Sequence, residues 1–221
     1  YGDIDARQLA MQQRFLDVPP EGTLIDYYDK QFLVYPGVFW PFADSKPLVE
    51  SLLITPGERV LDMCSGSGVI AVYAACKGAS HVLAVDRTVN CMRAIQANAA
   101  RHNVAPIIEA RCSDMFTHVW SDELFDVVTA NLPFRNRLAK TDVERTQWDQ
   151  GLYVHRTFFT HIGQHLAPQG RLYLAQANFG AVAEMHTFAT EAGFQVQKIA
   201  EHTMSPPDPR IFYAFELRKT S

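Results

Sequence analysis

The sequence predicts an α/β fold with a doubly wound, mostly parallel sheet of seven strands. From about residue 56 onward, short apolar strands alternate with helical segments, a pattern typical of helices covering both faces of one sheet. Residues 125–130 form a nearly continuous apolar run, as in strands buried on both faces. The chain has 221 residues, of which 48% are hydrophobic and 20% charged, and this suits one domain with a short appendage.

The first 43 residues differ from the rest and are interpreted as an N-terminal extension. A short helix is expected over residues 5–15, and Pro19 and Pro20 end it. Aromatic side chains then crowd residues 27–42: Tyr27, Tyr28, Phe32, Tyr35, Phe39, Trp40 and Phe42. Two interpretations stay open for this stretch, namely ordinary packing and a short helical and aromatic lid over a ligand.

A second unit is expected over residues 44–221, in which Asp44 and Ser45 cap a helix that begins near Pro47. Its strands and helices alternate, which implies right-handed crossovers. The last two strands have only a proline-rich loop between them, so an antiparallel hairpin with an antiparallel edge strand is expected. The predicted strands are 59–63, 81–85, 106–110, 125–130, 171–176, 194–200 and 211–217, and the predicted helices are 68–77, 88–102, 148–166 and 181–192.

Composition narrows the possible partners. Twenty Lys and Arg residues against 24 Asp and Glu residues give a net charge of −4, which argues against a large nucleic-acid footprint. No apolar run approaches the ~18 residues that span a bilayer, and residues 1–20 lack the layout of a signal peptide. No C-x-x-C pair occurs, so we expect reduced, buried thiols in a cytoplasmic protein and neither a zinc site nor any other metal site. The four cysteines are Cys64, Cys76, Cys91 and Cys112.

Four loops carry the candidate site, because ligands of doubly wound sheets bind beyond the carboxyl ends of the strands. The first loop follows Asp62 and contains Gly66 and Gly68, which let backbone approach a ligand closely. Asp86 ends the second strand, where an acid can accept hydrogen bonds from ribose hydroxyls. Asp114 and Asn131 follow the third and fourth strands. A glycine-rich loop alone is weak evidence, but four polar loops in register form a much stronger pattern.

With these residues the chain resembles the class I S-adenosylmethionine (SAM)-dependent methyltransferases. It is most similar to the branch of the HemK-type glutamine methyltransferases and the "methyltransferase small domain" ribosomal guanine-N2 enzymes. Residues 60–68, Val-Leu-Asp-Met-Cys-Ser-Gly-Ser-Gly, match the motif D-x-[GC]-x-G-x-G, with Cys64 in the first-glycine place. Residues 35–45 resemble the segment that precedes the domain in this branch, and residues 149–152, Asp-Gln-Gly-Leu, resemble its Asp-Gly-Leu. The resemblance covers about residues 35–217 and implies a Rossmann-like fold with SAM as cofactor.

The resemblance also implies the cofactor-binding residues. Asp62 and Gly66 would lie against the methionine part, Asp86 would hold the ribose, and Asp114 would hold the adenine amine. The full implied set is Asp62, Cys64, Gly66, Gly68, Asp86, Arg87, Asp114, Met115, Phe116, Tyr35, Trp40 and Asp44.

The implied catalytic residues are Asn131, Leu132, Pro133 and Phe134, which resemble the branch's Asn-Pro-Pro-Tyr/Phe motif. In that motif the Asn side chain and the next carbonyl accept hydrogen bonds from a planar NH2 group, on which the aromatic ring stacks. The nitrogen lone pair then points at the methyl carbon. Leu132 departs from the pattern, although it precedes Pro133 and therefore keeps an extended backbone. Its extra bulk and N–H imply a different substrate.

Three functions follow as hypotheses. The first is methyl transfer to the nitrogen of an amine, amide or NH2 group of a small molecule, because the acidic 43-residue extension is shorter than the substrate domains of the HemK enzymes. The second is cyclisation of SAM itself to azetidine-2-carboxylate with release of methylthioadenosine, as in synthases of the same fold. The third is SAM binding without catalysis. The sequence leaves the acceptor, the oligomeric state, the pathway and the true N-terminus open.

Two further groups of residues have plainer interpretations. His161 and His165 lie four residues apart on a predicted helix without the H-E-x-x-H pattern, and we expect them at the surface or an interface. Arg135, Arg137 and Lys140 are expected in a solvated loop, with the alternative that they hold a substrate carboxylate or phosphate.

Overall fold

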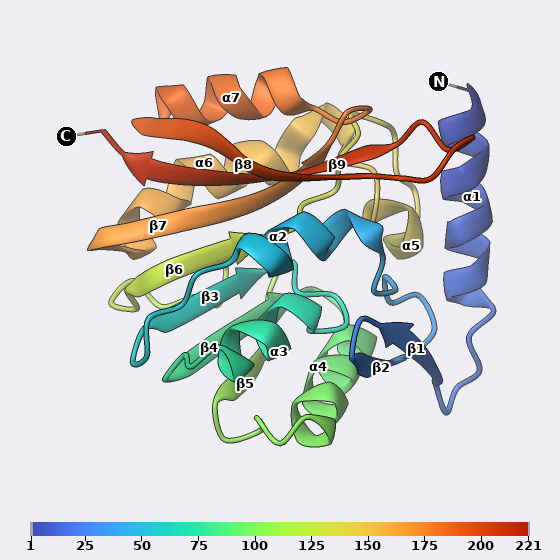
Figure 1. Ribbon diagram of the computed structural model, residues 1–221, viewed down its shortest axis with the longest axis horizontal. Coiled ribbons are helices and arrows are strands. Elements are labelled where there is room, and N and C mark those ends of the chain that lie inside the picture. The colour runs from blue at the N-terminus through green and yellow to red at the C-terminus, as the bar shows by residue number, and fades with distance from the viewer. Residues whose placement is uncertain (1, 221) are drawn as a thin grey trace.

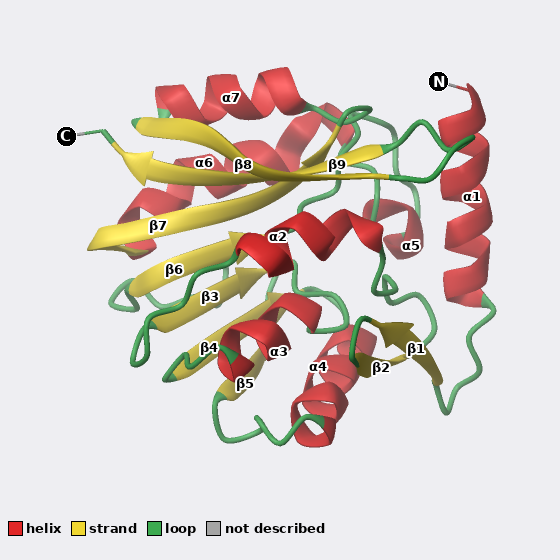
Figure 2. Cartoon of the chain, viewed as in Figure 1, coloured by secondary structure: helices red, strands yellow, loops and turns green. Residues whose placement is uncertain are grey.

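The computed structural model describes residues 2–220 as an α/β domain built on one seven-stranded sheet (Figures 1 and 2). The strand order is β5-β4-β3-β6-β7-β9-β8, and a separate two-stranded sheet pairs β1 with β2. The elements are α1 (Gly2–Leu16), β1 (Thr23–Tyr27), β2 (Lys30–Val34), η1 (Ala43–Ser45), α2 (Lys46–Ser51), β3 (Arg59–Met63), α3 (Val69–Cys76), β4 (His81–Asp86), α4 (Val89–Arg101), β5 (Ile108–Cys112), β6 (Phe125–Ala130), α5 (Asp142–Arg145), η2 (Gln150–Leu152), α6 (Tyr153–His165), β7 (Leu166–Ala177), α7 (Val182–Glu191), β8 (Phe194–Thr203) and β9 (Ile211–Lys219). The predicted fold class is confirmed.

Two hydrophobic layers hold helices on opposite faces of the sheet. Successive strand residues point to opposite faces, so Val60 joins the cluster that contains α2, α3 and α4, whereas Leu61 joins the cluster of α6 and α7. Val127 and Val128 divide in the same way on β6. Burial on both faces explains the apolar residues that follow one another in these central strands, and their buried polar side chains, Asp62 and Thr129, bond to each other.

The last two strands form the predicted antiparallel hairpin at one end of the sheet. β9 lies between β7 and β8 and runs antiparallel to both. The antiparallel strand β9 is therefore the second strand from this edge of the sheet, and β8 is the edge strand.

Several predicted boundaries are wrong for local backbone reasons. The helix expected from residue 148 begins at Tyr153, because Gly151 has a left-handed φ of 67° and interrupts the helical turn. The third strand of the sheet runs from Ile108 to Cys112, two residues later than expected, and Cys112 pairs with Asp86 at its end.

The aromatic stretch contains a hairpin that was not predicted, β1 paired with β2. Tyr27 and Phe32 are buried, and Phe32 packs beside the rings of Tyr73 and His102, with ring centroids 6.3 and 5.1 Å away. The Asn98 side chain of α4 holds the hairpin by bonding both the N–H (2.7 Å) and the carbonyl (2.9 Å) of Leu33. Ordinary packing therefore describes the first part of this stretch.

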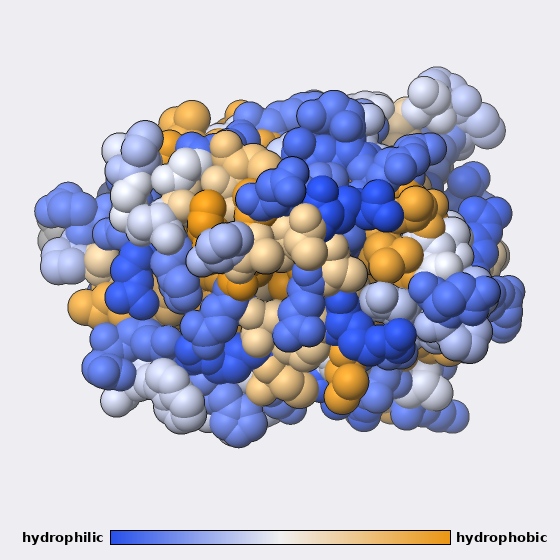
Figure 3. Space-filling view, turned by 90° about the horizontal axis from the view of Figure 1, so that it is seen from below, coloured by the Kyte–Doolittle hydropathy of each residue, from blue (hydrophilic) through white to orange (hydrophobic). Residues whose placement is uncertain are grey.

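Figure 1 shows α1 standing beyond the carboxyl ends of the parallel strands, with β1 and β2 beside α4. The face seen in Figure 3 carries hydrophilic residues over much of its area. No helix within residues 2–220 is long and apolar enough to cross a membrane. The cysteines are free thiols, but the expectation that all are buried is wrong, because Cys76 and Cys112 are exposed.

Candidate active site

A cavity of about 500 Å³ opens beyond the carboxyl ends of β3, β4, β5 and β6. Its walls come from the four loops that follow these strands and from residues 37–45. Its remaining wall comes from α1, from residues 139–154 and from the side chains of Phe179, Arg210 and Phe212. The volume lies within the range of small-molecule sites, about 300–1,000 Å³.

The loop after β3 is shaped by a buried carboxylate. Asp62 is fully buried and accepts hydrogen bonds from Ser65 Oγ (2.6 Å) and Thr129 Oγ1 (2.7 Å). Burial raises the pKa of Asp62 to about 6. Asp62 lies beneath the cavity rather than along its wall, so it holds the loop in shape.

Left-handed backbone recurs along the same loop. Gly68 has a φ of 82°, and a Cβ there would lie 3.3 Å from the backbone of Ile95, so glycine permits the close approach of α3 and α4. Cys64 has a φ of 57° although it is not glycine. Its sulfur lies 3.9 Å from that of Met115.

Asp86 joins the first two loops. Its Oδ2 accepts a hydrogen bond from the Gly66 N–H (2.8 Å) and its Oδ1 accepts one from the Arg87 N–H (2.7 Å). Arg87 in turn lies 3.3 Å from Asp142, and both line the cavity. The carboxylate of Asp86 therefore stands at the end of β4 with its position fixed by backbone groups.

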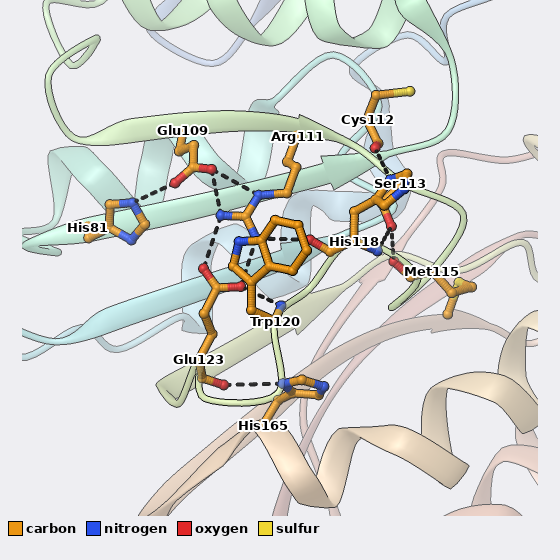
Figure 4. A network of polar contacts seen from close by, with 10 residues as sticks. All are labelled: His81, Glu109, Arg111, Cys112, Ser113, Met115, His118, Trp120, Glu123 and His165. Atoms are coloured by element: carbon orange, nitrogen blue, oxygen red, sulfur yellow. Dashed lines mark hydrogen bonds and ion pairs between the residues drawn. The ribbon is translucent and has the colours of Figure 1, made fainter.

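The third loop is anchored by a polar network at the edge strand β5 (Figure 4). Arg111 donates to Glu109 and to Glu123, with N–O distances of 2.6 to 3.0 Å. Ser113 Oγ donates to the Met115 carbonyl (2.8 Å) and accepts from the His118 N–H (2.9 Å). These contacts fix Asp114 and Met115 on the cavity wall.

Phe116 is turned away from the cavity by the same network. Its ring stacks on that of His165, with centroids 5.2 Å apart, and His165 donates to the Glu123 carbonyl (3.1 Å). His165 is 4% exposed, so the expectation of a surface histidine is wrong there. His161 is half-buried and also stacks on Phe116.

The loop after β6 presents Asn131 to the cavity in one orientation. Asn131 Nδ2 donates to Asp44 Oδ2 at 2.6 Å. A carboxylate can only accept hydrogen bonds, so the amide turns its NH2 toward Asp44 and leaves its Oδ1 available as an acceptor. Leu132, Pro133 and Phe134 line the cavity beside it, and Leu132 also belongs to the core that packs on α6.

Two buried polar atoms on the cavity wall have no hydrogen-bond partner within residues 2–220. They are Asp44 Oδ1 and Trp40 Nε1. Asp44 is 3% exposed, and burial raises its pKa to about 6, while the hydrogen bond from Asn131, the backbone N–H groups of Ser45 and Asp44, and last Arg210 act in the opposite direction. Buried polar groups in proteins are nearly always paired, so these atoms point to a ligand.

The structure brings most of the predicted site residues to the cavity. Lining residues among them are Asn131, Leu132, Pro133, Phe134, Cys64, Gly66, Asp86, Arg87, Asp114, Met115, Trp40 and Asp44. Asp62, Gly68, Phe116 and Tyr35 do not line it. Tyr35 instead lies under the guanidinium of Arg93, 3.9 Å from its ring centroid.

Sequence reasoning left open a lid in the first 43 residues, but it missed the polar contacts between α1 and the segment that follows β6. Gln8 Oε1 accepts from Trp148 Nε1 (2.9 Å) and from Arg135 (3.0 Å), and Gln12 donates to Gln147 (3.0 Å). The expectation of a solvated basic loop is therefore wrong for Arg135.

Asp5 of α1 adds ion pairs to the contact between α1 and the loop after β6. It pairs with both Arg135 and Arg137, and these arginines lower its pKa, chiefly through the hydrogen bond from Arg135. Two cationic side chains on the loop are thus engaged by one helix residue. Neither is a free cation awaiting a substrate anion.

Asp149 also lines this wall and starts a buried chain of hydrogen bonds. It accepts from His155 Nδ1 (2.9 Å), and His155 Nε2 accepts from Gln176 Nε2 (3.0 Å). Asp149 also accepts from the backbone N–H groups of Val154 and His155. These hydrogen bonds tie the start of α6 to β7 and fix the position of the Asp149 carboxylate at the cavity.

These donors and acceptors fit S-adenosylmethionine. A carboxylate at the end of β4 suits ribose hydroxyls, the glycine loop permits close backbone approach, and the carboxylates suit a sulfonium ion. The sheet order and the loops are those of the class I S-adenosylmethionine-dependent methyltransferase fold. S-adenosylmethionine is the cofactor of that class.

The chain belongs to the family described as the methyltransferase small domain, whose sequence model matches residues 31–199. The release factor glutamine methyltransferase of Koribacter versatilis is 28% identical over 177 residues, which cover 73% of this chain and 62% of that protein. The enzyme of the same name from Cereibacter sphaeroides is 30% identical over 170 residues, covering 70% and 60%. The chain thus spans about three fifths of the length of these relatives.

The fold also matches solved structures. The ribosomal protein L11 methylase of Lactobacillus delbrueckii subsp. bulgaricus superposes with a TM-score of 0.58 at 21% identity, over 78% of this chain and 75% of that one. At this identity the likeness concerns the fold.

Proposed function

We propose that the protein transfers a methyl group from S-adenosylmethionine to a nitrogen atom of a small acceptor. The observation that carries this proposal is the Asn131 amide, held by the buried Asp44 so that its oxygen faces the cavity as an acceptor. Such an oxygen can fix a nitrogen that bears hydrogens and leave its lone pair free.

The chain's own residues position the acceptor. Asn131 accepts a hydrogen bond from the nitrogen, and the extended backbone before Pro133 directs the Leu132 carbonyl toward the same place. Phe134 offers a ring face, supported by Phe179 and Phe212, whose centroids lie 6.1 and 6.3 Å away. S-adenosylmethionine supplies the methyl carbon when bound. Alignment of this kind can contribute several kcal/mol, up to roughly 7–11.

The wall formed by α1 supports a small acceptor. Gln8 and Met11 line the cavity, and Trp148 is buried under α1. A folded protein or RNA would have to displace these contacts to reach Asn131. The named relatives methylate a release factor, and they are longer than this chain, so a protein acceptor is the competing outcome.

A second candidate is cyclisation of S-adenosylmethionine itself, with its own amine as the nucleophile. The wall formed by α1 favours cyclisation, since a cavity of about 500 Å³ leaves little room for a second molecule beside the cofactor. In this reaction the amine attacks the γ carbon, the bond from that carbon to sulfur breaks, and methylthioadenosine leaves.

Incubation of the protein with S-adenosylmethionine alone, followed by mass spectrometry, separates the two candidates. Methylthioadenosine as product supports cyclisation. Turnover to S-adenosylhomocysteine only after an acceptor is added supports methyl transfer. Absence of either product with any acceptor pool, despite tight cofactor binding, would leave a binding protein without catalysis.

Substitution of Asn131 tests its role in either reaction. We expect Asn131→Ala to lower the turnover rate by roughly 10²-fold or more, the range seen when a positioning group is lost. Affinity for S-adenosylhomocysteine, measured by calorimetry, should change much less. Equal losses in turnover and affinity would show that Asn131 only shapes the cofactor pocket.

A further inference from the structure

The carboxylate of Asp44 is an unusual group for the wall of a methyl-transfer site. It is 3% exposed, one oxygen is held by Asn131, and the other has no partner within the described chain. The nearby Arg210 is engaged by Asp208 instead, at 2.6 Å. A buried carboxylate without a cation is costly, and a cationic ligand group would remove that cost.

We propose that Asp44 is a catalytic residue that binds the acceptor nitrogen through Oδ1, and that the acceptor is an amine which enters as an ammonium ion. This inference rests on the proposed function and narrows its substrate class. An amide NH2 has two N–H donors, whereas a primary ammonium has three. Asn131 Oδ1, the Leu132 carbonyl and Asp44 Oδ1 provide three acceptors.

The charge of an ammonium also explains why a carboxylate stands beside Asn131. An ammonium nitrogen has no lone pair and cannot attack carbon until it loses a proton. Asp44 Oδ1 takes that proton, which gives a neutral amine and a neutral carboxylic acid. Burial, which raises the pKa of Asp44 to about 6, makes this carboxylate a stronger base than an exposed aspartate.

The transfer then balances without another reactant. The neutral amine turns about its C–N bond, which moves the lone pair from Asp44 Oδ1 to the methyl carbon. The lone pair then forms the bond to the methyl carbon while the methyl–sulfur bond breaks, and that electron pair stays on sulfur. The product is an N-methylammonium ion beside a neutral thioether. Asp44 returns its proton to water after the products leave.

Sinefungin tests the position of Asp44 without turnover. In this analogue a carbon replaces the sulfur of S-adenosylmethionine and an amine replaces the transferred methyl group, whereas S-adenosylhomocysteine keeps the sulfur and has no group in the methyl position. The amino-acid part and the nucleoside are the same in both. The ratio of their dissociation constants, measured by calorimetry at pH 8, therefore isolates the contact made by an ammonium at the transfer position.

We expect wild-type protein to bind sinefungin more tightly than S-adenosylhomocysteine, and Asp44→Asn to reduce that preference at least tenfold. The asparagine retains an oxygen that accepts from Asn131 but has no charge. Asp142→Asn is the matched control, since it removes a carboxylate from the cavity wall near Arg87, and it should leave the ratio unchanged. Equal loss of both ligands in Asp44→Asn would place Asp44 against the amino-acid part and overturn the proposal.

Wild-type protein gives a second readout that does not depend on folding of a variant. Binding of an ammonium requires the ionised form of Asp44, so the preference for sinefungin should fall as the pH drops from 8 to 5. Among the other groups around Asp44, Arg210 is paired with Asp208 and Asn131 carries no charge. Burial raises the pKa of Tyr27, so its hydroxyl stays neutral in this range. A ratio that does not change with pH would overturn the proposal.

The two proposals fail in different ways. A methylated amide as the natural product, formed equally well by Asp44→Asn, would keep methyl transfer and overturn the role of Asp44. Conversely, an Asp44-dependent sinefungin preference in a protein that forms only methylthioadenosine would support the ammonium site while refuting methyl transfer.

Discussion

Cys64 shows how one residue controls the cofactor loop. It occupies a position with a φ of 57°, directly before Ser65 and Gly66. For an L-residue such backbone costs roughly 1–2 kcal/mol, and the related motif has glycine or cysteine there. The half-buried thiol faces Met115, and burial and nearby acids raise its pKa. Its effect on the loop is therefore conformational and steric.

We expect Cys64→Val to be at least about 2 kcal/mol less stable than Cys64→Gly, because a β-branched side chain is poorly tolerated at positive φ. The measurement is urea unfolding followed by circular dichroism. Cys91 is the matched control, since it is buried within α4, which has ordinary helical backbone. There the order should reverse, with Cys91→Gly less stable than Cys91→Val by up to about 1 kcal/mol. The same order at both positions would contradict the backbone explanation.

At the scale of elements, the strand-end loops and the helix near the N-terminus could be predicted, and the hairpin of β1 and β2 could not. Parallel strands place their carboxyl ends at one edge, so Asp86, Asp114 and Asn131 were bound to meet near Gly66. The hairpin of β1 and β2 has Tyr28 and Asp29 at its turn, and Tyr28 takes a φ of 53°. Two-residue hairpin turns are usually predicted from an Asn-Gly or Asp-Gly pair, and this turn contains neither.

The contact between α1 and the loop after β6 has no local signal at all. Gln8 meets Trp148 across 140 residues of sequence and meets Arg135 across 127. From the sequence alone, polar residues on a short helix are equally consistent with a face exposed to solvent. Only the position of α1 beyond the strand ends, as Figure 1 shows, turns them into part of the cavity wall.

We expect Gln8→Leu to loosen that wall. The substitution leaves the Trp148 N–H buried without an acceptor, which costs about 1–3 kcal/mol. Hydrogen exchange read by mass spectrometry should accelerate at least about fivefold in peptides covering residues 135–150, the local equivalent of that loss. Gln13→Leu is the matched control, since Gln13 is exposed and bonds only to Asp17 in the same segment. Equal exchange in both variants would mean that α1 does not hold the loop.

At the scale of the whole molecule, the pH dependence of stability is set by two opposing groups of carboxyls. Two are buried without a cation, and two form ion pairs with arginines. Asp44 and Asp62 both have their pKa raised to about 6 by burial. Glu58, held by Arg171, and Asp208, held by Arg210, have theirs lowered chiefly by those arginines. The first pair favours the folded state at low pH, and the second pair favours it at higher pH.

The direction in which stability changes with pH depends on which state, folded or unfolded, binds more protons. Between about pH 4 and 6 the folded protein holds the protons of Asp44 and Asp62 more firmly than the unfolded chain does, so its free energy of unfolding falls as the pH rises. Below about pH 4 the pairs of Glu58 and Asp208 are lost as those carboxylates gain protons. Stability of the cofactor-free protein should therefore peak near pH 4 and fall from there to about pH 6.

Urea unfolding at half-unit steps from pH 4 to pH 8 measures this profile. Each raised carboxyl costs at most roughly 3 kcal/mol at neutral pH, at about 1.4 kcal/mol for each pH unit between its ordinary and raised pKa. Asp44→Asn removes one of the two titrating groups, so the fall from pH 5 to pH 7 should be about half that of wild type. Glu58→Gln should lower the free energy of unfolding by a constant amount from pH 5 to pH 7, because the pair with Arg171 stabilises the fold throughout that range, so the fall itself should be unchanged. A free energy of unfolding that rises steadily from pH 5 to pH 7 would show that neither buried acid is destabilised by its site, and the base assigned to Asp44 would then be no stronger than an exposed aspartate.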